Sequence, residues 1–463
     1  MTYLEQALQA IEYGLLPAVR IEGRPQPPLG LRERMARFRV PGFGVAFIED
    51  AEIAAVRGFG VKEVGGDDPV TGDTLFQAAS ISKAVTAMAA LHLVEASILD
   101  LDVDVNQALR SWQIPENEHT RTSKVTLRGL LSHTAGLTVY GYRGYPNGHD
   151  LPTLQQVLDG EPPANSDPVR VFQEPETAYS YSSGSDVVVQ QLLMDVTGRP
   201  FADLLQELIF DKLGMAHSTF EQPVPVACAA AAATAHRNDG QPVPGRWHVY
   251  PELAAAGLWT TPSDLARVVV EVLKSFAGQS NAVLSAEMTR QMLTRRLGPY
   301  GLGFFIIERE GRTRFQRPGW NEGYHSYMGG CVDNGQGMVW MTNGENGMLL
   351  GLEVLRGLAE LLDWHDFHTL EKAVARVDPA VLEDYAGSYQ YGDYPEYGAV
   401  VGSEGDRLVL QETPDGLRYE LYPASKTTFF ALDRHEPIAF IRDDDGHVEA
   451  MMIGDFERLN RME

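Results

Sequence analysis

The hydrophobic pattern of this 463-residue chain changes once, near residue 370, and this change constrains the fold more than any other feature. Up to about Phe367, apolar segments with helical spacing alternate with short runs typical of strands. From about Asp378 onward, apolar and polar residues alternate with period two between turn sequences such as PDG and DDDG. The sequence therefore predicts a domain of mixed helices and strands (α/β or α+β) over residues 1–367 and a small antiparallel β-barrel or sandwich over residues 378–463.

Individual segments predict individual elements. Three long apolar segments of the first domain predict helices: SDVVVQQLLMDVTG, SDLARVVVEVL and LLGLEVLRGLAELL. Two shorter runs there predict strands: FGVAFIED and GMVWMTN. Five period-two segments of the second domain predict closely spaced strands: DRLVLQ, LRYELYP, TTFFAL, IAFIR and HVEAMMI.

Composition and charge exclude several classes of partner. The formal net charge of -25 at pH 7 argues against nucleic acid, which binds to basic surfaces. No apolar run reaches the length of a membrane-spanning helix, and the N-terminal segment lacks the pattern of a secretory leader, so we expect a cytoplasmic protein without membrane contact. The two cysteines, Cys228 and Cys331, match neither a disulfide framework nor a zinc pattern.

A single lysine interrupts the apolar segment Phe76–Leu93, three residues after a serine. The segment is rich in helix formers and lacks glycine and proline, so we expect a helix from Ser80 to Glu95. Ser80 and Lys83 would then lie one turn apart on one face. Burial among apolar neighbours lowers the pKa of an ammonium, which would let Lys83 take a proton from the Ser80 hydroxyl, and the helix N-terminus would stabilise the developing anion.

The same two residues have an ordinary structural interpretation, in which Ser80 caps the helix and Lys83 extends its ammonium to solvent. With 20 serines and 7 lysines in the chain, chance predicts about 0.3 serine–lysine pairs of this spacing, and the sequence holds one. Spacing alone leaves both interpretations open, so the catalytic one needs partner residues elsewhere in the chain.

Six segments supply such partners, in this order: VPGFGVAFIED, VTGDTLFQAASISK, VTLRGLLSHTAGL, YSSGSDVVVQQLLMDVTGRPF, GLWTTPSDLARVV and YGLGF. Together they cover about residues 30–365 and resemble the serine β-lactamase and penicillin-binding-protein-like hydrolases, specifically the class C and esterase branch. The resemblance implies a central antiparallel sheet flanked by helices, with a helical subdomain and Ser80 at their junction. The C-terminal β domain resembles the lipocalin-like modules that follow this domain in some family members and there cover the active site or assist assembly.

The resemblance assigns roles to three residues. Ser80 matches the family's nucleophile, and Lys83 matches its hydrogen-bonded base or proton shuttle. In AYSYSSG, Tyr179 and Tyr181 compete for the second motif, and only Tyr181 has the family's usual separation from Gly198 at the next helix end. Tyr181 is therefore the expected general base and acid, and a packed aromatic with a satisfied hydroxyl is its structural alternative.

The second motif departs from the family pattern at its third position. Ser183 stands where asparagine is usual. A hydroxyl can still hydrogen-bond the lysine or the substrate, but it lacks the amide's simultaneous donor and acceptor arms. This departure weakens the expectation of an efficient β-lactamase.

The third motif, usually lysine or histidine followed by any residue and glycine, reads Arg317, Pro318, Gly319. The arginine fork suits a substrate carboxylate, although arginine serves poorly as a proton donor near neutral pH. Gly319 would let substrate approach the backbone, and the N–H groups of Trp320 and Ser80 would form the oxyanion hole. The structural alternative is a turn whose arginine points to solvent.

Other candidate residues carry weaker signals. Tyr140, Tyr142 and Tyr145 suit the wall of an acyl pocket and equally suit packing within their own loop. His133, in LSHTAG, is expected to be structural. The chain has no GxSxG elbow and no glycine-rich phosphate loop, and the HDFH histidine pair has no further ligands nearby, so we expect no metal and no cofactor.

The sequence therefore predicts a serine hydrolase that forms an acyl-enzyme on Ser80. We expect a carboxylesterase, or a peptidase or amidase, acting on small esters or on peptides that include D-residues. Three alternatives stay open: a β-lactamase or D-alanyl-D-alanine carboxypeptidase, a transacylase, and a non-catalytic member that binds peptidoglycan fragments or a protein partner. The expected partner is a small ester, amide or peptide, and assembly into a homo-oligomer stays open.

Overall fold

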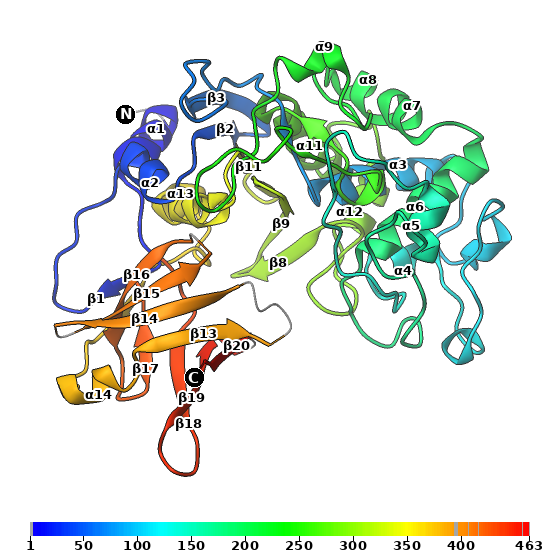
Figure 1. Ribbon diagram of the computed structural model, residues 1–463. Helices are drawn as coiled ribbons and strands as arrows, with labels where there is room; N and C mark the ends of the chain where they lie inside the picture. The colour runs from blue at the N-terminus through cyan, green and yellow to red at the C-terminus, as the bar shows by residue number, and fades with distance from the viewer. Residues whose placement is uncertain (1–2, 393–396, 406, 415, 456, 463) are drawn as a thin grey trace. The chain divides into compact units, whose positions relative to one another are not determined.

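The computed structural model describes residues 3–392, 397–405, 407–414, 416–455 and 457–462 (Figure 1). The chain divides into two compact units. Residues Val40–Gly347 form the first, which we call the sheet unit, and Met1–Arg39 with Met348–Glu463 form the second, which we call the barrel unit. The terminal residues of the two predicted domains, 1 and 463, lie outside the described residues.

A six-stranded antiparallel sheet is the framework of the sheet unit, with strand order β3-β2-β11-β10-β9-β8. Its strands are β2 (Gly42–Glu49), β3 (Glu52–Gly60), β8 (Phe305–Arg309), β9 (Arg312–Asn321), β10 (Tyr324–Cys331) and β11 (Gln336–Thr342). β2 and β11 coincide with two predicted strands, and both are buried along almost their whole length, which explains their continuous apolar sequence. Two short antiparallel pairs lie outside this sheet: β4 (Phe76–Gln77) with β7 (Trp259–Thr260), and β5 (Tyr145–Pro146) with β6 (His248–Val249).

Helices pack on this sheet and on one another. α3 (Ile81–Glu95) is buried along nearly its whole length, and its small alanines let α6 (Ser183–Thr197) and α10 (Leu253–Ala256) approach it closely. α4 (Leu127–Leu131) and α5 (Leu154–Asp159) lie beside α6 (Figure 1). α11 (Pro262–Phe276) packs against β2, β10 and β11, and Thr261 caps its first turn by accepting from the Asp264 N–H at 3.1 Å. The other helices of the unit are α7 (Phe201–Leu205), α8 (Asp211–Leu213), α9 (Val226–Ala229) and α12 (Ala286–Met292).

The barrel unit contains a closed barrel of eight antiparallel strands in sequence order. These are β13 (Gly387–Tyr391), β14 (Gly398–Glu404), β15 (Arg407–Thr413), β16 (Arg418–Pro423), β17 (Thr428–Phe430), β18 (Ile438–Arg442), β19 (Val448–Ile453) and β20 (Glu457–Arg461). The five period-two segments coincide with strands β15 to β19, except that Asp406, the first residue of DRLVLQ, lies outside the described residues. Their inward positions bury aromatic rings such as Phe429 and Phe440, whose centroids lie 5.6 Å apart.

The barrel unit combines an N-terminal segment with the C-terminal part of the chain. It also contains α1 (Tyr3–Tyr13), α2 (Leu31–Arg37), α13 (Gly347–Leu362), α14 (Pro379–Glu383) and the parallel pair β1 (Val19–Ile21) with β12 (Leu370–Lys372). Arg34 on α2 forms a bidentate pair with the buried Glu353 on α13, with N–O distances of 2.7 and 2.6 Å. The Arg34 guanidinium also donates to Asp433 at 2.6 Å. These contacts explain why the first 39 residues group with the C-terminal part.

The predicted fold class is confirmed: an antiparallel sheet flanked by helices, followed by a closed C-terminal β-barrel. The grouping of residues 1–39 with the barrel has no local signal in the sequence, since Arg34 and Glu353 are 319 positions apart. Among the described residues, no helix combines the length and the apolar character needed to cross a membrane.

Candidate active site

A strained turn positions Ser80 at the start of α3. Ala79 has a φ of 51°, in the left-handed region that residues with a side chain rarely adopt, and Ser80 returns to helical values with a φ of -61°. The Ser82 hydroxyl stabilises this turn by donating to the Ala79 carbonyl at 2.6 Å and accepting from the Leu258 N–H at 3.0 Å. Strain that is held by neighbouring bonds in this way is typical of functional sites.

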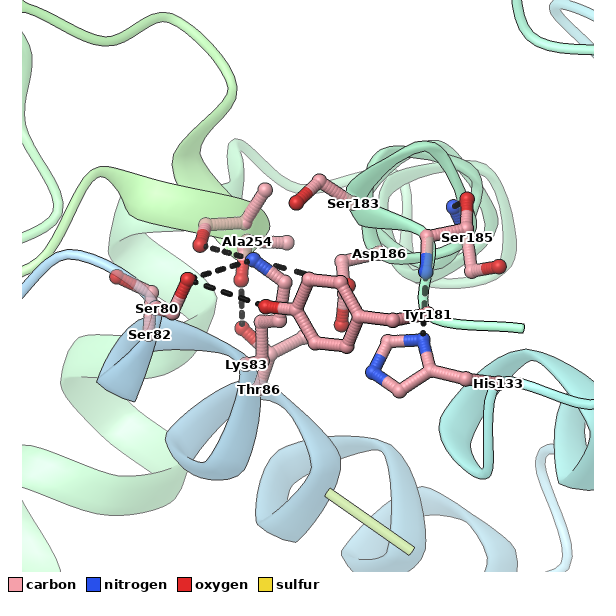
Figure 2. A network of polar contacts seen from close by, with 12 residues as sticks. Ser80, Ser82, Lys83, Thr86, His133, Tyr181, Ser183, Ser185, Asp186 and Ala254 are labelled. Carbon is pink, nitrogen blue, oxygen red and sulfur yellow. Dashed lines mark hydrogen bonds and ion pairs between the residues drawn. The ribbon is translucent and has the colours of Figure 1, made fainter. Parts of the chain in front are cut away.

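The side chains of Ser80, Lys83 and Tyr181 converge beside this turn (Figure 2). The Ser80 Oγ lies 3.2 Å from Lys83 Nζ and 3.2 Å from Tyr181 Oη. The lysine comes from the first turn of α3 and the tyrosine from the segment just before α6. The predicted nucleophile thus has a hydrogen bond to each of the two predicted proton carriers.

Lys83 is buried, and two acceptors surround its ammonium on the side away from Ser80. Nζ donates to the Ala255 carbonyl at 2.7 Å and lies 3.9 Å from the Asp186 carboxylate. Burial raises the pKa of Asp186 to about 7, although the charges of Lys83 and Arg317 oppose this rise. Asp186 is not among the residues predicted from the sequence, where its only signal is a lone acid at the start of the apolar run of α6.

Tyr181 has the electrostatic environment of a base. Burial alone would raise the pKa of its phenol, but the positive charges of Arg317 and Lys83 outweigh burial, and the hydrogen bond with Ser80 acts in the same direction. The pKa of Tyr181 therefore lies below its usual value. The Arg317 guanidinium donates to Tyr181 Oη at 2.7 Å, a short charge-assisted bond that stabilises the phenolate.

Arg317 is fully buried beneath the site. Its Nε donates to the main-chain carbonyl of Ser80 at 2.9 Å. Its guanidinium carbon lies 5.3 Å from the ring centres of Tyr181 and Tyr300 and 5.6 Å from that of Phe305. Arg317 thus directs its charge to the Tyr181 phenol and to the main chain of Ser80. The sequence had instead suggested an exposed guanidinium that binds a substrate carboxylate.

Gly319 and Trp320 continue β9 past Arg317. A Cβ on Gly319 would lie 2.2 Å from the Ala78 carbonyl oxygen and 2.5 Å from Ser326 Oγ, so only glycine fits between the strand and the turn that carries Ser80. Strand alternation puts the Trp320 side chain on the sheet face opposite Arg317 and Gly319. There its ring is 63% exposed and stacks on His325 with centroids 6.0 Å apart.

Ser183 is buried at the start of α6, and its hydroxyl donates to the main-chain carbonyl of Tyr140 at 2.8 Å. Of the three loop tyrosines, only Tyr140 has an exposed ring, with 77% of its surface accessible. Tyr142 is partly buried, and Tyr145 is buried with its hydroxyl accepting from the Asn165 N–H at 3.1 Å. Tyr142 and Tyr145 are therefore packing residues of the loop.

His133 and Tyr179 pack behind Tyr181. The His133 ring lies 4.5 Å from that of Tyr181, and its Nδ1 accepts from the Ser182 N–H at 3.4 Å (Figure 2). Burial, together with the charges of Arg317 and Lys83, holds the pKa of His133 well below its usual value, so the ring is neutral. The Tyr179 ring packs on the far side of His133, at 6.3 Å.

The described residues contain no group of three or more histidine, cysteine or acidic side chains arranged to hold a metal ion. Cys228 and Cys331 are both free thiols.

Comparisons with known proteins identify relatives of this chain. The beta-lactamase family model matches residues 31–360. Penicillin-binding protein 4* of Bacillus subtilis (strain 168) is 24% identical over 420 residues, which cover 86% of this chain and 89% of that protein. Esterase EstB of Burkholderia gladioli is 30% identical over 225 residues, 47% of this chain and 54% of that protein.

The fold is similar to that of the octameric penicillin-binding protein homologue from Pyrococcus abyssi, with a TM-score of 0.62 and 21% sequence identity. The alignment covers 93% of this chain and 98% of that one, so it includes both units. With the family model matching most of the chain, this protein belongs to the beta-lactamase family and is a serine hydrolase of that fold.

Proposed function

We propose that this protein is a carboxylesterase, or a peptidase or amidase, that forms an acyl-enzyme on Ser80 with small esters or peptides, including those of D-residues. The observation that carries the proposal is the position of Ser80 Oγ, which lies 3.2 Å from both Lys83 Nζ and Tyr181 Oη. A hydroxyl becomes a useful nucleophile when a neighbouring base can take its proton, and two such groups flank this one.

The proton follows the hydrogen bonds of the site. Ser80 Oγ attacks the substrate carbonyl while its proton moves to the Tyr181 phenolate, which Lys83 and Arg317 stabilise. Tyr181 then gives this proton to the leaving alkoxide or amine, and the acyl group stays on Ser80. In the second step Tyr181 takes a proton from water, which attacks the ester carbonyl. The bond to Ser80 Oγ then breaks, Tyr181 returns the proton to this oxygen, and the acid is released.

Main-chain N–H groups of β9 and of the turn at Ser80 can stabilise the negative charge that forms on the substrate carbonyl oxygen. Gly319 brings the strand against the Ala78 carbonyl, next to Ser80. The N–H groups of Ser80 and Trp320 are the proposed oxyanion hole, and donors of this type are each worth about 3 kcal/mol in the transition state. This arrangement serves ester and amide substrates alike.

The position of Ser183 favours the esterase over a β-lactamase or carboxypeptidase. Its hydroxyl is engaged by the Tyr140 carbonyl at 2.8 Å, so the site offers no amide at the place where the family pattern has asparagine. The similarity to an esterase, EstB, supports the same choice.

The octameric state of the Pyrococcus homologue supports a homo-oligomer as the assembly of this chain.

Intact-protein mass spectrometry tests the proposal. Wild type and Ser80→Ala are mixed with p-nitrophenyl esters, D- and L-aminoacyl anilides and a chromogenic cephalosporin, while absorbance is followed in parallel. We expect turnover of esters or anilides that depends on Ser80, with a slow, long-lived cephalosporin adduct. Fast cephalosporin hydrolysis would favour the β-lactamase, and a wild type without adduct or turnover would favour a binding protein.

A further inference from the structure

An exposed aromatic ring lies directly beside the proton carrier of the site. Tyr140 is 77% exposed, and its ring centroid lies 5.1 Å from that of Tyr181, with the ring planes tilted by 57°. Single exposed aromatic rings are common on protein surfaces, so the exposure of Tyr140 matters here because the ring also contacts Tyr181. The free face of Tyr140 is therefore available to a molecule bound at Ser80.

The loop that carries Tyr140 is fastened to the start of α6 by three consecutive residues. Ser182 Oγ donates to the Thr138 carbonyl at 2.7 Å and the Gly184 N–H donates to the Val139 carbonyl at 3.1 Å. The Ser183 Oγ donates to the Tyr140 carbonyl at 2.8 Å. The main-chain carbonyls of Thr138, Val139 and Tyr140 each accept one of these hydrogen bonds. The backbone of the loop is therefore held in place up to Tyr140, which bears the exposed ring.

The bonds hold the backbone in a strained conformation. Val139 has a φ of 69°, which is unfavourable for a β-branched residue. Gly184 allows the close approach, since a Cβ there would lie 2.6 Å from the Thr138 carbonyl oxygen. The strained conformation at Val139 is thus the one in which the Tyr140 ring is exposed and contacts Tyr181.

We infer that Tyr140 is a specificity-determining residue whose ring contacts an aromatic or large apolar group of the substrate, and that Ser183 is a positioning residue that acts through the Tyr140 backbone. The inference rests on the proposed function, since it concerns which substrates the acyl-enzyme chemistry accepts. It also explains Ser183 without a contact to Lys83 or to the substrate. A single aromatic contact changes binding by roughly twofold to tenfold, which sets the size of the expected effect.

Two matched substrate pairs measure this preference on either side of the scissile bond. The first pair, p-nitrophenyl phenylacetate and p-nitrophenyl acetate, differs in the acyl group, and the second, phenyl acetate and ethyl acetate, differs in the leaving group. We expect Tyr140→Ala to lower the ratio of kcat/KM within at least one pair by about threefold to tenfold, and Tyr140→Phe to keep the wild-type ratio. Phe172→Ala is the control, because Phe172 is another aromatic residue with an exposed ring in the sheet unit, and it should leave both ratios unchanged.

A double-mutant cycle separates positioning from direct contact. If Ser183 acts through Tyr140, Ser183→Ala lowers the same ratio as Tyr140→Ala, and in the Tyr140→Ala background it lowers that ratio no further. An equal loss of kcat for all four substrates on Ser183→Ala, additive with Tyr140→Ala, would overturn the positioning role. Unchanged ratios for Tyr140→Ala in both pairs would overturn the specificity role. A wild type that turns over neither these esters nor the aminoacyl anilides, and forms no adduct, would instead overturn the proposed function itself.

Discussion

Arg317 lies 2.7 Å from the phenol oxygen of Tyr181, and its guanidinium faces three aromatic rings and no solvent. Its charge is the main reason why the pKa of Tyr181 falls below its usual value despite burial. The proposed base is the Tyr181 phenolate, so activity should increase as pH rises through this lowered pKa.

Arg317→Met removes that charge and keeps much of the side-chain volume. The pKa of Tyr181 should then rise, so the ascending limb of kcat/KM against pH should move to higher pH by about one unit or more. The measurement is a pH–rate profile from pH 5 to 10. Arg312→Met is the control, because Arg312 is exposed on the same strand. If the ascending limb of the pH–rate profile did not move in Arg317→Met, Arg317 would not be what lowers the pKa of Tyr181.

Tyr181 and Tyr179 are two residues apart, and only Tyr181 contacts Ser80. Tyr181→Phe removes the proton carrier and should lower kcat by about a hundredfold or more. Tyr179→Phe should keep kcat within about twofold, because burial raises the pKa of Tyr179 to about 12 and its ring packs on His133. Steady-state kinetics on one ester compares the two variants, and equal losses would mean that the phenol of Tyr181 has no special role.

Gly319→Ala tests how closely β9 approaches the turn before Ser80. The new methyl group would lie 2.2 Å from the Ala78 carbonyl, so we expect the free energy of unfolding to fall by about 2 kcal/mol or more, with a loss of kcat. Gly402→Ala is a matched change in strand β14, where nothing lies within 4 Å of the added atom, and it should be nearly neutral. Urea denaturation measures the free energy of unfolding of both variants. A stable, fully active Gly319→Ala would show that β9 does not approach the Ala78 carbonyl closely enough to exclude a side chain.

Glu252 precedes α10 and is fully buried. Burial raises the pKa of Glu252 to about 8 from 4.5, so between these pH values the folded protein holds a proton that the unfolded chain releases. The free energy of unfolding should therefore fall as pH rises from about 5 to 8. Glu252→Gln removes this contribution, so its stability relative to wild type should be higher at pH 8 than at pH 5. If the free energy of unfolding had the same pH dependence in wild type and Glu252→Gln, Glu252 would not be a buried, protonated carboxyl in the folded protein.

Sequence patterns predicted the parts of the site that depend on local geometry. The spacing of Ser80 and Lys83 on one helix turn follows from the helical repeat, and the structure places these side chains 3.2 Å apart. The barrel strands were visible because period-two alternation is a property of each strand by itself. The contact between Ser80 and Tyr181 spans 101 positions, and only the resemblance to a known family indicated it.

The features of the site that the sequence did not predict depend on packing between distant segments. Asp186 lies beside Lys83 because α6 packs on α3, and no spacing rule connects the two helices. The side of β9 that Arg317 occupies, and hence its burial, depends on strand register with β10. Likewise, a serine at position 183 suggested a weaker substrate contact, whereas the structure directs its hydroxyl to a neighbouring loop.

The pairing of Arg34 with Glu353 has a consequence for how the chain is made. α2 leaves the ribosome early, but its ionic partner follows 319 residues later, after the whole sheet unit has been synthesised. During that interval the buried face of α2 has no α13 to cover it, and its guanidinium has no carboxylate. The sheet unit can fold as an uninterrupted stretch of chain, whereas the barrel unit can be completed only after the segments beyond residue 347 have been made. Segments made late therefore secure a segment made early.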